Sequence, residues 1–318
     1  MRRSLHVPRA AAFLAFVLAI TAPTAGLAQD ANFRARSPLV VVPVTVTDKR
    51  GQPIDGLDKS DFELYDNRVR RPFKLDAPGL YQASVSVVLV VQTSGISHSA
   101  LLKIHKVGSL ADGYITGEGG EAALIAAGDQ VTTVQGFTPS GGDLSSAFRR
   151  LRAGDPMSGR ILDGIDAALR LLAAKPAGRR RIVIVVGESR DRGSEAKPGD
   201  VLTLAQRENV TIYTISYSTY ITPFTTKADD WESTPGVDQG PNWLAIFTEL
   251  GRLSKENIDS LENDLAAIGK EVHSQYLLSF VPASDSAPAF HSIQVEMKAN
   301  PQAVIRTRPG YWTVAPEK

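Results

Sequence analysis

The sequence SVSVVLVVQTSGIS, from Ser84 to Ser97, carries the strongest indication of how this chain folds. The residues from Val85 to Val91 are almost wholly β-branched or aliphatic, and small hydroxyl residues and a glycine follow them at once. A continuous apolar run bounded by turn residues is typical of a strand buried on both faces in a parallel sheet covered by helices. Ligands of such sheets bind beyond the carboxyl ends of the strands, so Thr93, Ser94 and Ser97 mark an edge where a site is expected.

Strand and helix patterns alternate along the chain after this run. Buried-type strands are predicted at 121–127, 181–186 and 210–216, and a strand at 130–134 pairs with the first of these through the turn Gly128-Asp129. Helices are predicted at 99–110, 144–151, 161–174, 198–209, 242–251 and 258–272, with a long polar loop at 217–240. Alternation of this kind implies right-handed crossovers and a parallel sheet, which is an α/β fold.

Short strand patterns flank this region on both sides. They lie at 39–47, 61–66 and 69–75 before it, and at 275–281, 292–298 and 303–307 after it. In the segment DFELYD, Phe62, Leu64 and Tyr65 are candidate core residues. We expect the two flanks to form one small β-sandwich that carries the α/β unit, with two independent β appendages as the alternative.

The amino-acid composition and net charge exclude several classes of protein and of functional site. The chain has 318 residues, of which 43% are hydrophobic and 22% charged, as in a globular protein. The formal net charge of +1 gives no electrostatic reason to expect nucleic acid or an anionic membrane surface as a partner. Because there is no cysteine, the chain has no disulfides, thiolate metal sites or cysteine nucleophiles.

The amino terminus has the pattern of a signal peptide. Arg2, Arg3 and Arg9 give a basic region, an apolar run of 11 residues follows from Ala10 to Ile20, and Gly26-Leu27-Ala28 is a small-residue cleavage site. We expect residues 1–28 to be removed, residues 29–38 to form a leader, and the protein to be exported to the periplasm or beyond the cell. The apolar run is too short to span a bilayer, so no transmembrane anchor is expected after cleavage.

The order of elements over 85–273 resembles that of von Willebrand factor type A (VWA) domains. The flanking sequences VVVPVTVTDKRGQPIDGLDKSDFELYDN, QYLLSFVP and IRTRPGYW extend the likeness to the secreted VWFA-related proteins of Acidobacteria. The resemblance implies a Rossmann-like VWA domain at 85–273 between two parts of a β-sandwich at 39–84 and 274–314.

The resemblance also implies where a metal would lie. In VWA domains, oxygen-bearing side chains from separate loops hold one Mg²⁺, and a carboxylate of the partner completes its octahedron. The first loop, Asp-x-Ser-x-Ser in the family, reads Gln92-Thr93-Ser94-Gly95-Ile96 here, with Ser97 one residue on. The threonine of the second loop corresponds to Gly159, next to Ser158, and Glu188 replaces the aspartate of the third loop, followed by Asp191.

These departures predict a degenerate metal-ion-dependent adhesion site. Mg²⁺ requires near-ideal octahedral geometry, and this loop set has lost one carboxylate and lengthened another. We therefore expect a metal-free scaffold without a cofactor. The alternative is a weak Mg²⁺ or Mn²⁺ site on Ser94, Ser97, Glu188 and Asp191.

Other chemistry has little support in the sequence. Gly187-Glu188-Ser189-Arg190-Asp191 lacks the second glycine of a nucleophile elbow, and no histidine, including His291, can be paired with an aspartate. Arg179-Arg180-Arg181 is predicted to be a solvated loop. Trp231 and Trp243 bracket an acidic loop where an exposed aromatic could anchor a partner.

The sequence therefore predicts an exported, non-catalytic protein-binding or adhesion module of a bacterial cell. The binding edge would comprise the segments 92–97, 154–160 and 188–191 with part of 217–240. A structural or assembly component of the cell envelope that uses the sandwich surface is the first alternative. A serine hydrolase with Ser189 as nucleophile is the second.

Overall fold

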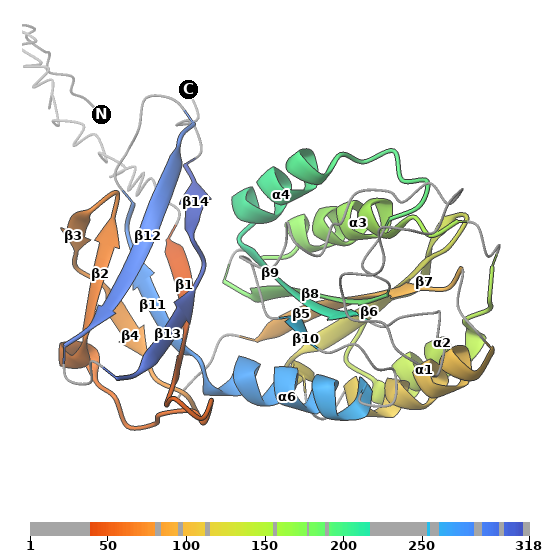
Figure 1. The fold of residues 1–318 in the computed structure, drawn as a ribbon, viewed down its shortest axis with the longest axis horizontal. Coiled ribbons are helices and arrows are strands. Elements are labelled where there is room, and N and C mark those ends of the chain that lie inside the picture. The colour runs from red at the N-terminus through yellow and green to blue at the C-terminus, as the bar shows by residue number, and fades with distance from the viewer. Residues whose placement is uncertain are drawn as a thin grey trace, which may run out of the picture. The chain divides into compact units, whose positions relative to one another are not determined.

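In the computed structural model, the described residues are 39–79, 84–94, 98–111, 115–154, 158–176, 178–187, 191–216, 253–254, 261–282, 288–298 and 302–313. They form three sheets and the helices that cover the largest of them (Figure 1).

The six-stranded central sheet has the order β10-β9-β8-β5-β6-β7. Strand β5 (Val85–Gln92) lies in its middle and pairs in parallel with β6 (Glu121–Ala127) and β8 (Arg180–Gly187). Strands β9 (Val210–Ser216) and β10 (Leu253–Ser254) continue the parallel pairing, whereas β7 (Val131–Thr138) is antiparallel to β6. Every residue of β5 is buried, as its unbroken apolar run predicts.

Helices cover both faces of this sheet, and the side chains of β5 alternate between the two cores. Val87, Leu89 and Val91 pack with α1 (His98–Ala111), α2 (Gly141–Arg150) and α6 (Leu261–Ser274). Val88 and Val90 pack on the other face with α3 (Ile161–Ala173) and α4 (Pro198–Arg207). Figure 1 shows α3 and α4 above the sheet and the other three helices below it.

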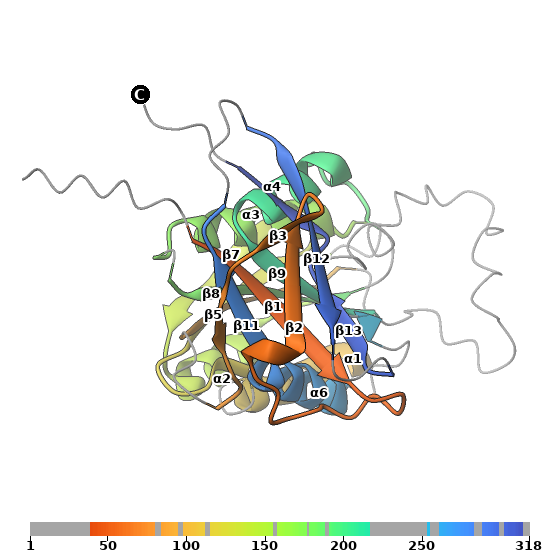
Figure 2. The ribbon, with the colours of Figure 1, turned by 90° about the vertical axis from the view of Figure 1, so that its left-hand side faces the viewer.

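Two four-stranded sheets form a β-sandwich from both ends of the described chain. One has the order β13-β1-β11-β4 and the other β14-β12-β2-β3. Their bounds are β1 (Val40–Thr47), β2 (Phe62–Asp66), β3 (Val69–Arg71), β4 (Lys74–Asp76), β11 (Tyr276–Phe280), β12 (Phe290–Met297), β13 (Val304–Thr307) and β14 (Gly310–Trp312), with a 3₁₀ turn η1 (Lys59–Asp61) before β2. Early and late strands pair in both sheets (Figure 2), β1 with β11 and β13 in one and β2 with β12 in the other, and the two sheets share one hydrophobic core. The predicted fold class, an α/β sheet with a sandwich made from both flanks, is confirmed.

Two details of the sandwich differ from the prediction. The strand expected at 69–75 is two strands in different sheets, because Pro72 has no N–H to donate and Phe73 turns into the core. Tyr65 is not a core residue, since the side chains of a strand alternate and those of Phe62 and Leu64 take the inner face. The Tyr65 hydroxyl donates instead to Glu63 Oε2 at 2.8 Å.

The arginine cluster before β8 is not a solvated loop, so that prediction is wrong. Arg179 Nε donates to Ser86 Oγ at 2.7 Å, and Arg181 Nη1 donates to Glu208 Oε2 at 3.0 Å. Each guanidinium fixes the start of β8 to a neighbouring element.

Arg180 belongs to a buried polar network that joins the sandwich to the α/β region. It donates to the carbonyl of Val272 at 2.7 Å and to the side-chain oxygen of Gln275. Gln275 Nε2 then donates to Thr45 Oγ1 at 3.1 Å and to the hydroxyl of Tyr213 at 3.2 Å. Burial raises the pKa of Tyr213, which keeps its hydroxyl neutral. This network links β1, β8, β9 and the end of α6.

A second contact lies between β14 and α4. Arg308 Nη2 donates to the carbonyl of Gln206 at 3.0 Å, and Trp312 Nε1 donates to Gln206 Oε1 at 3.0 Å. Burial lowers the pKa of Arg308 to about 10. The carbonyl of Gln206, in the last turn of α4, is thus paired with the guanidinium of Arg308 from the sandwich region.

Candidate functional site

The loops at the carboxyl end of the central strands are joined by backbone hydrogen bonds. Thr93 N donates to the carbonyl of Ala127 at 3.0 Å, and Gly154 N donates to the carbonyl of Thr93 at 3.0 Å. Gly159 and Arg192 exchange two further bonds of 2.9 and 3.1 Å. We call the described residues 92–94, 128–130, 154, 158–160 and 191–196 the loop edge. These residues come from four connections between helices or strands, because 154 and 158–160 both lie between α2 and α3. The connections meet there because parallel strands end at the same edge of a sheet.

Gln92, at the position of the family's leading carboxylate, lies under this edge. Its side chain is buried, and Nε2 donates to the carbonyl of Ser94 at 2.9 Å. It also fills the space beside two glycines: a Cβ at Gly159 would lie 3.0 Å from Nε2, and one at Gly187 would lie 2.9 Å from Oε1. A neutral amide is therefore packed under the loop edge, in contact with the loop after β5 and beside Gly159 and Gly187.

Ser94 is the most unusual residue of the loop edge. It is fully buried, and its Oγ has no hydrogen-bond partner among the described residues. Glycines surround this oxygen: a Cβ at Gly154 would lie 2.5 Å from it, and one at Gly128 would lie 2.9 Å from it. Since each of these distances is too short for a real Cβ, the Ser94 hydroxyl occupies the space that side chains at Gly128 and Gly154 would need.

Asp129 and Ser158 add to this part of the edge. Asp129 Oδ1 would lie 2.9 Å from the same Cβ at Gly154, which places an exposed carboxylate near Ser94. Ser158 Oγ is a second buried hydroxyl that has no partner in the described part of the chain. Asp129 was expected only as a turn residue. The signal that could have found it is that β6 pairs with β5, so the turn after β6 must border the loop after β5.

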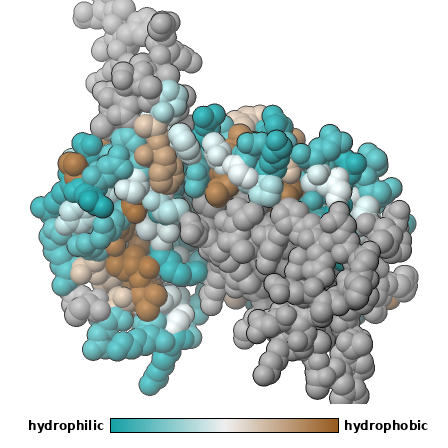
Figure 3. All heavy atoms as spheres, turned by 45° about the horizontal axis from the view of Figure 1, so that its top comes forward, coloured by the Kyte–Doolittle hydropathy of each residue, from teal (hydrophilic) through white to brown (hydrophobic). Residues whose placement is uncertain are grey.

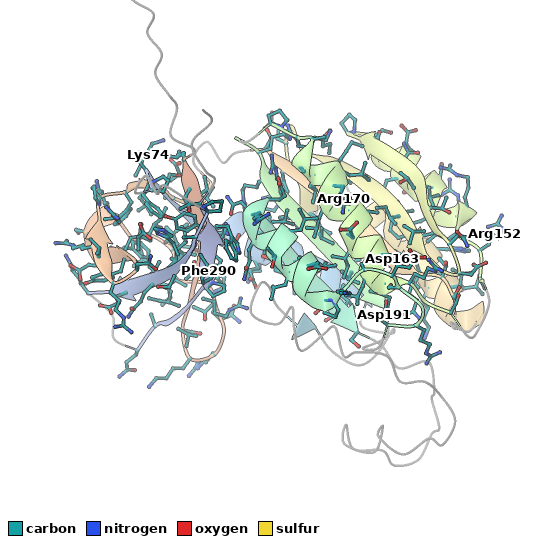
Figure 4. All side chains as sticks on the ribbon, turned by 90° about the horizontal axis from the view of Figure 1, so that it is seen from above. Lys74, Arg152, Asp163, Arg170, Asp191 and Phe290 are labelled. Atoms are coloured by element: carbon teal, nitrogen blue, oxygen red, sulfur yellow. The ribbon has the colours of Figure 1, made fainter. Side chains whose placement is uncertain are left out.

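Asp191 uses its carboxylate to hold the start of α3. Oδ1 accepts from Leu162 N at 2.9 Å and from Ser194 Oγ at 2.7 Å, and Oδ2 accepts from Ser194 N at 3.2 Å. Figure 4 shows Asp191 at the same end of α3 as Asp163, whose Oδ1 accepts from Ala196 N at 2.8 Å. A carboxylate at a helix N-terminus is stabilised by the orphan N–H groups there. The residue has a structural function that its spacing after β8 did not indicate.

The side chains of the described residues at the loop edge bear on whether a metal ion can bind there. Those residues contain no group of three or more His, Asp or Glu side chains that could hold a metal ion. Of the predicted ligands, Ser97 and Glu188 lie outside the described residues, as do Ser189 and both tryptophans Trp231 and Trp243. The roles of Gln92, Thr93, Ser94, Ser158, Gly159 and Asp191 in binding stay predictions.

No aspartate could be paired with His291 from the sequence, but the structure pairs it with one. His291 Nδ1 lies 2.7 Å from Asp66 Oδ1, and both side chains are buried in the sandwich core. Arg71 Nε pairs with Asp66 Oδ2 at 3.2 Å, and the hydroxyl of Tyr311 lies 3.3 Å from His291 Nδ1. The pair belongs to the sandwich and not to the loop edge.

Comparison with known proteins finds similar folds among solved structures. No protein-family model and no curated protein matches the chain. Among solved structures, a von Willebrand factor type A protein from Catenulispora acidiphila is 11% identical, covers 83% of this chain and 76% of its own, and has a TM-score of 0.49. The sheet covered by helices on both faces and edged by the antiparallel β7 is the α/β sheet that the sequence predicts.

Two other solved structures are similar to this chain. Proximal thread matrix protein 1 from the mussel byssus, described with a zinc-occupied MIDAS motif, is 15% identical, with coverage of 65% of this chain and 49% of its own and a TM-score of 0.46. The vWF domain of the type V pili tip protein Mfa5 from Porphyromonas gingivalis is 12% identical, with coverage of 59% and 95% and a TM-score of 0.43. Among the helices that the structure describes, none is both long and apolar enough to cross a membrane.

Proposed function

We propose that this protein is an exported, non-catalytic protein-binding module whose loop edge recognises its partner by direct hydrogen bonds, without a bridging cation. The buried Ser94 hydroxyl carries the proposal. A buried donor without a partner costs about 1 to 3 kcal/mol, and a partner segment that displaces the glycine loops over Ser94 and pairs with its hydroxyl would recover that free energy.

The chemistry of the loop edge supports a neutral contact. A hydroxyl can donate one hydrogen bond and accept others, so Ser94 suits a carbonyl, an amide or a carboxylate of a partner. The Gln92 amide brings no charge, and the Asp191 carboxylate is already bonded to the start of α3. Partner specificity would then come from shape and hydrogen bonding around Gly128 and Gly154.

Replacing Ser94 with alanine tests the proposal directly. The Ser94→Ala variant should be about 1 kcal/mol more stable than the wild type, because it removes a buried unpaired group, while it should lose retention of the partner. Thermal unfolding gives the stability, and capture by the immobilised mature chain from cell-envelope fractions gives the binding. Ser292→Ala, on the exposed side of β12, is the matched control and should change neither.

The same capture in the presence of a chelator distinguishes the two modes of binding. Retention that survives EDTA and is lost in Ser94→Ala supports the proposal. Retention that EDTA abolishes would show that a cation bridges the partner, and a Ser94→Ala variant that unfolds more easily would show that the hydroxyl is structural.

Calorimetric titration of the mature chain tests the absence of a cofactor. We expect affinities for Mg²⁺ and Mn²⁺ to be millimolar or weaker at neutral pH, because the edge lacks the leading carboxylate that a hard cation needs. Saturable micromolar binding that Ser94→Ala abolishes would instead establish the alternative site on Ser94, Ser97, Glu188 and Asp191.

The envelope-component alternative also has an observation in its favour. Several large hydrophobic side chains are exposed on the sandwich region, namely Leu39, Val69, Val281, Phe290 and Val304. Figure 3 shows brown side chains scattered over this region among hydrophilic neighbours. Exposed apolar residues favour contact with another protein when they are contiguous, and here they are spread over several strands, so we place the loop edge first.

A further inference from the structure

We propose a second interaction surface, a groove between α1 and α2 that binds an acidic, amphipathic segment of a partner protein. The two helices lie side by side on one face of the central sheet (Figure 1). A hollow of about 490 Å³ lies between them, lined by Leu102, His105, Lys106, Ser145 and Arg149. This groove lies on the face of the central sheet that α1 and α2 cover, and its lining residues are not those of the loop edge.

The spacing of the lining residues explains how the groove forms. His105 and Lys106 lie three and four residues after Leu102 on α1, and Ser145 and Arg149 are four apart on α2, so each set lies on one face of its helix. The opposite faces carry the apolar residues that anchor the helices to the sheet, among them Ile104 and Phe148. The groove is therefore held by a packed core beneath it.

Leu102 gives the groove an apolar contact. Its side chain is 47% exposed, and among the described large hydrophobic residues that are exposed it is the one that belongs to the α/β region. A leucine left in solvent beside a hollow can receive an apolar side chain from a partner, which buries area on both sides.

The charge of the two helices selects the kind of partner. The segments 98–111 and 141–152 contain the cations Lys103, Lys106, Arg149, Arg150 and Arg152 against one acid, Asp143. Lys106 and Arg149, which line the hollow, are exposed. Because the whole chain carries a net charge of only +1, these two helices hold a local positive excess that attracts carboxylates, while the acids Glu262, Asp264 and Glu271 of this face lie on α6.

An acidic amphipathic helix matches both features. Apolar side chains at helical spacing would contact Leu102, and carboxylates beside them would pair with Lys106 and Arg149. Nucleic acid would use the cations but leave Leu102 without an apolar contact, and a flat lipid surface does not fill a hollow between two helices, so we commit to a protein segment.

The test uses the mature chain and a labelled peptide. The probe is a fluorescein-labelled amphipathic helical peptide with Leu and Glu on one face, and its control is the same peptide with Lys at each Glu. Fluorescence anisotropy should show binding of the acidic peptide alone, weakened by added salt. The double variant Lys106→Glu/Arg149→Glu should weaken this binding at least about tenfold, and Leu102→Ser should also weaken it.

Arg170→Glu is the matched charge reversal. Arg170 is an exposed arginine on α3, on the other face of the sheet (Figure 4), and its reversal should change peptide affinity by less than about twofold. Circular dichroism checks that all variants keep their helices. Equal binding of the two peptides, equal effects of the two reversals, or tighter binding of phosphatidylglycerol vesicles or duplex DNA than of the acidic peptide would each overturn the proposal.

Discussion

Replacing His291 with alanine should lower the free energy of unfolding by about 3 to 5 kcal/mol. Asp66 has no exposed side-chain surface, and in the wild type its two oxygens face His291 Nδ1 and Arg71 Nε. Without the imidazole, Oδ1 stays buried and loses the 2.7 Å contact with His291 Nδ1. The cost of an unpaired buried acceptor exceeds the value of the lost bond, which is why the expected effect is large. Chemical denaturation followed by circular dichroism measures it.

A double-mutant cycle separates the pair from the packing around it. Asp66→Ala alone should also be strongly destabilising, but the double variant should cost much less than the sum, because neither group is then left unpaired. Ser292→Ala, the next residue on β12 and on its exposed side, should lie within about 0.5 kcal/mol of the wild type. Additive losses would show that the two side chains act independently, against the 2.7 Å contact.

The pair of Asp66 and His291 shows which features of the fold could be predicted from the sequence and which could not. Local patterns predicted β5, the alternating helices and the flanking strands, because burial on a strand or helix repeats over a few residues. Asp66 and His291 are separated by 225 positions, and nothing near either residue indicates the other. Only the antiparallel pairing of β2 with β12 brings the two strands together, and a single sequence does not contain that pairing.

At the candidate site, too, the position of the loops could be predicted from the sequence, whereas the contacts of each side chain could not. That the loops after β5 and β8 would meet was predictable, since parallel strands end at one edge of a sheet. What each side chain does there was not. The Asp191 carboxylate accepts hydrogen bonds from Leu162 N and from Ser194. The Ser94 hydroxyl is enclosed by glycines that come from two other loops. These contacts depend on backbone placement at the scale of a single Cβ, which a pattern of residue types does not specify.

Leu89→Ala in the middle of β5 should cost about 2 to 5 kcal/mol of stability. Leu89 is fully buried and lies in register with Leu124 of β6 and Ile184 of β8. Truncation would leave a cavity under α1 and α6 that strands fixed on both sides cannot close, so the cavity adds to the lost transfer free energy. Thermal and denaturant unfolding of the mature chain measure the loss.

Leu102→Ala makes the same chemical change at an exposed position of α1 and should cost less than about 0.5 kcal/mol. Leu89→Met, which keeps most of the volume, should cost less than about 1.5 kcal/mol. A Leu89→Ala loss no larger than that of Leu102→Ala would mean that β5 is not covered on the α1 face. The loop edge would then lack its support, because Gln92, Thr93 and Ser94 owe their position to the strand that ends there.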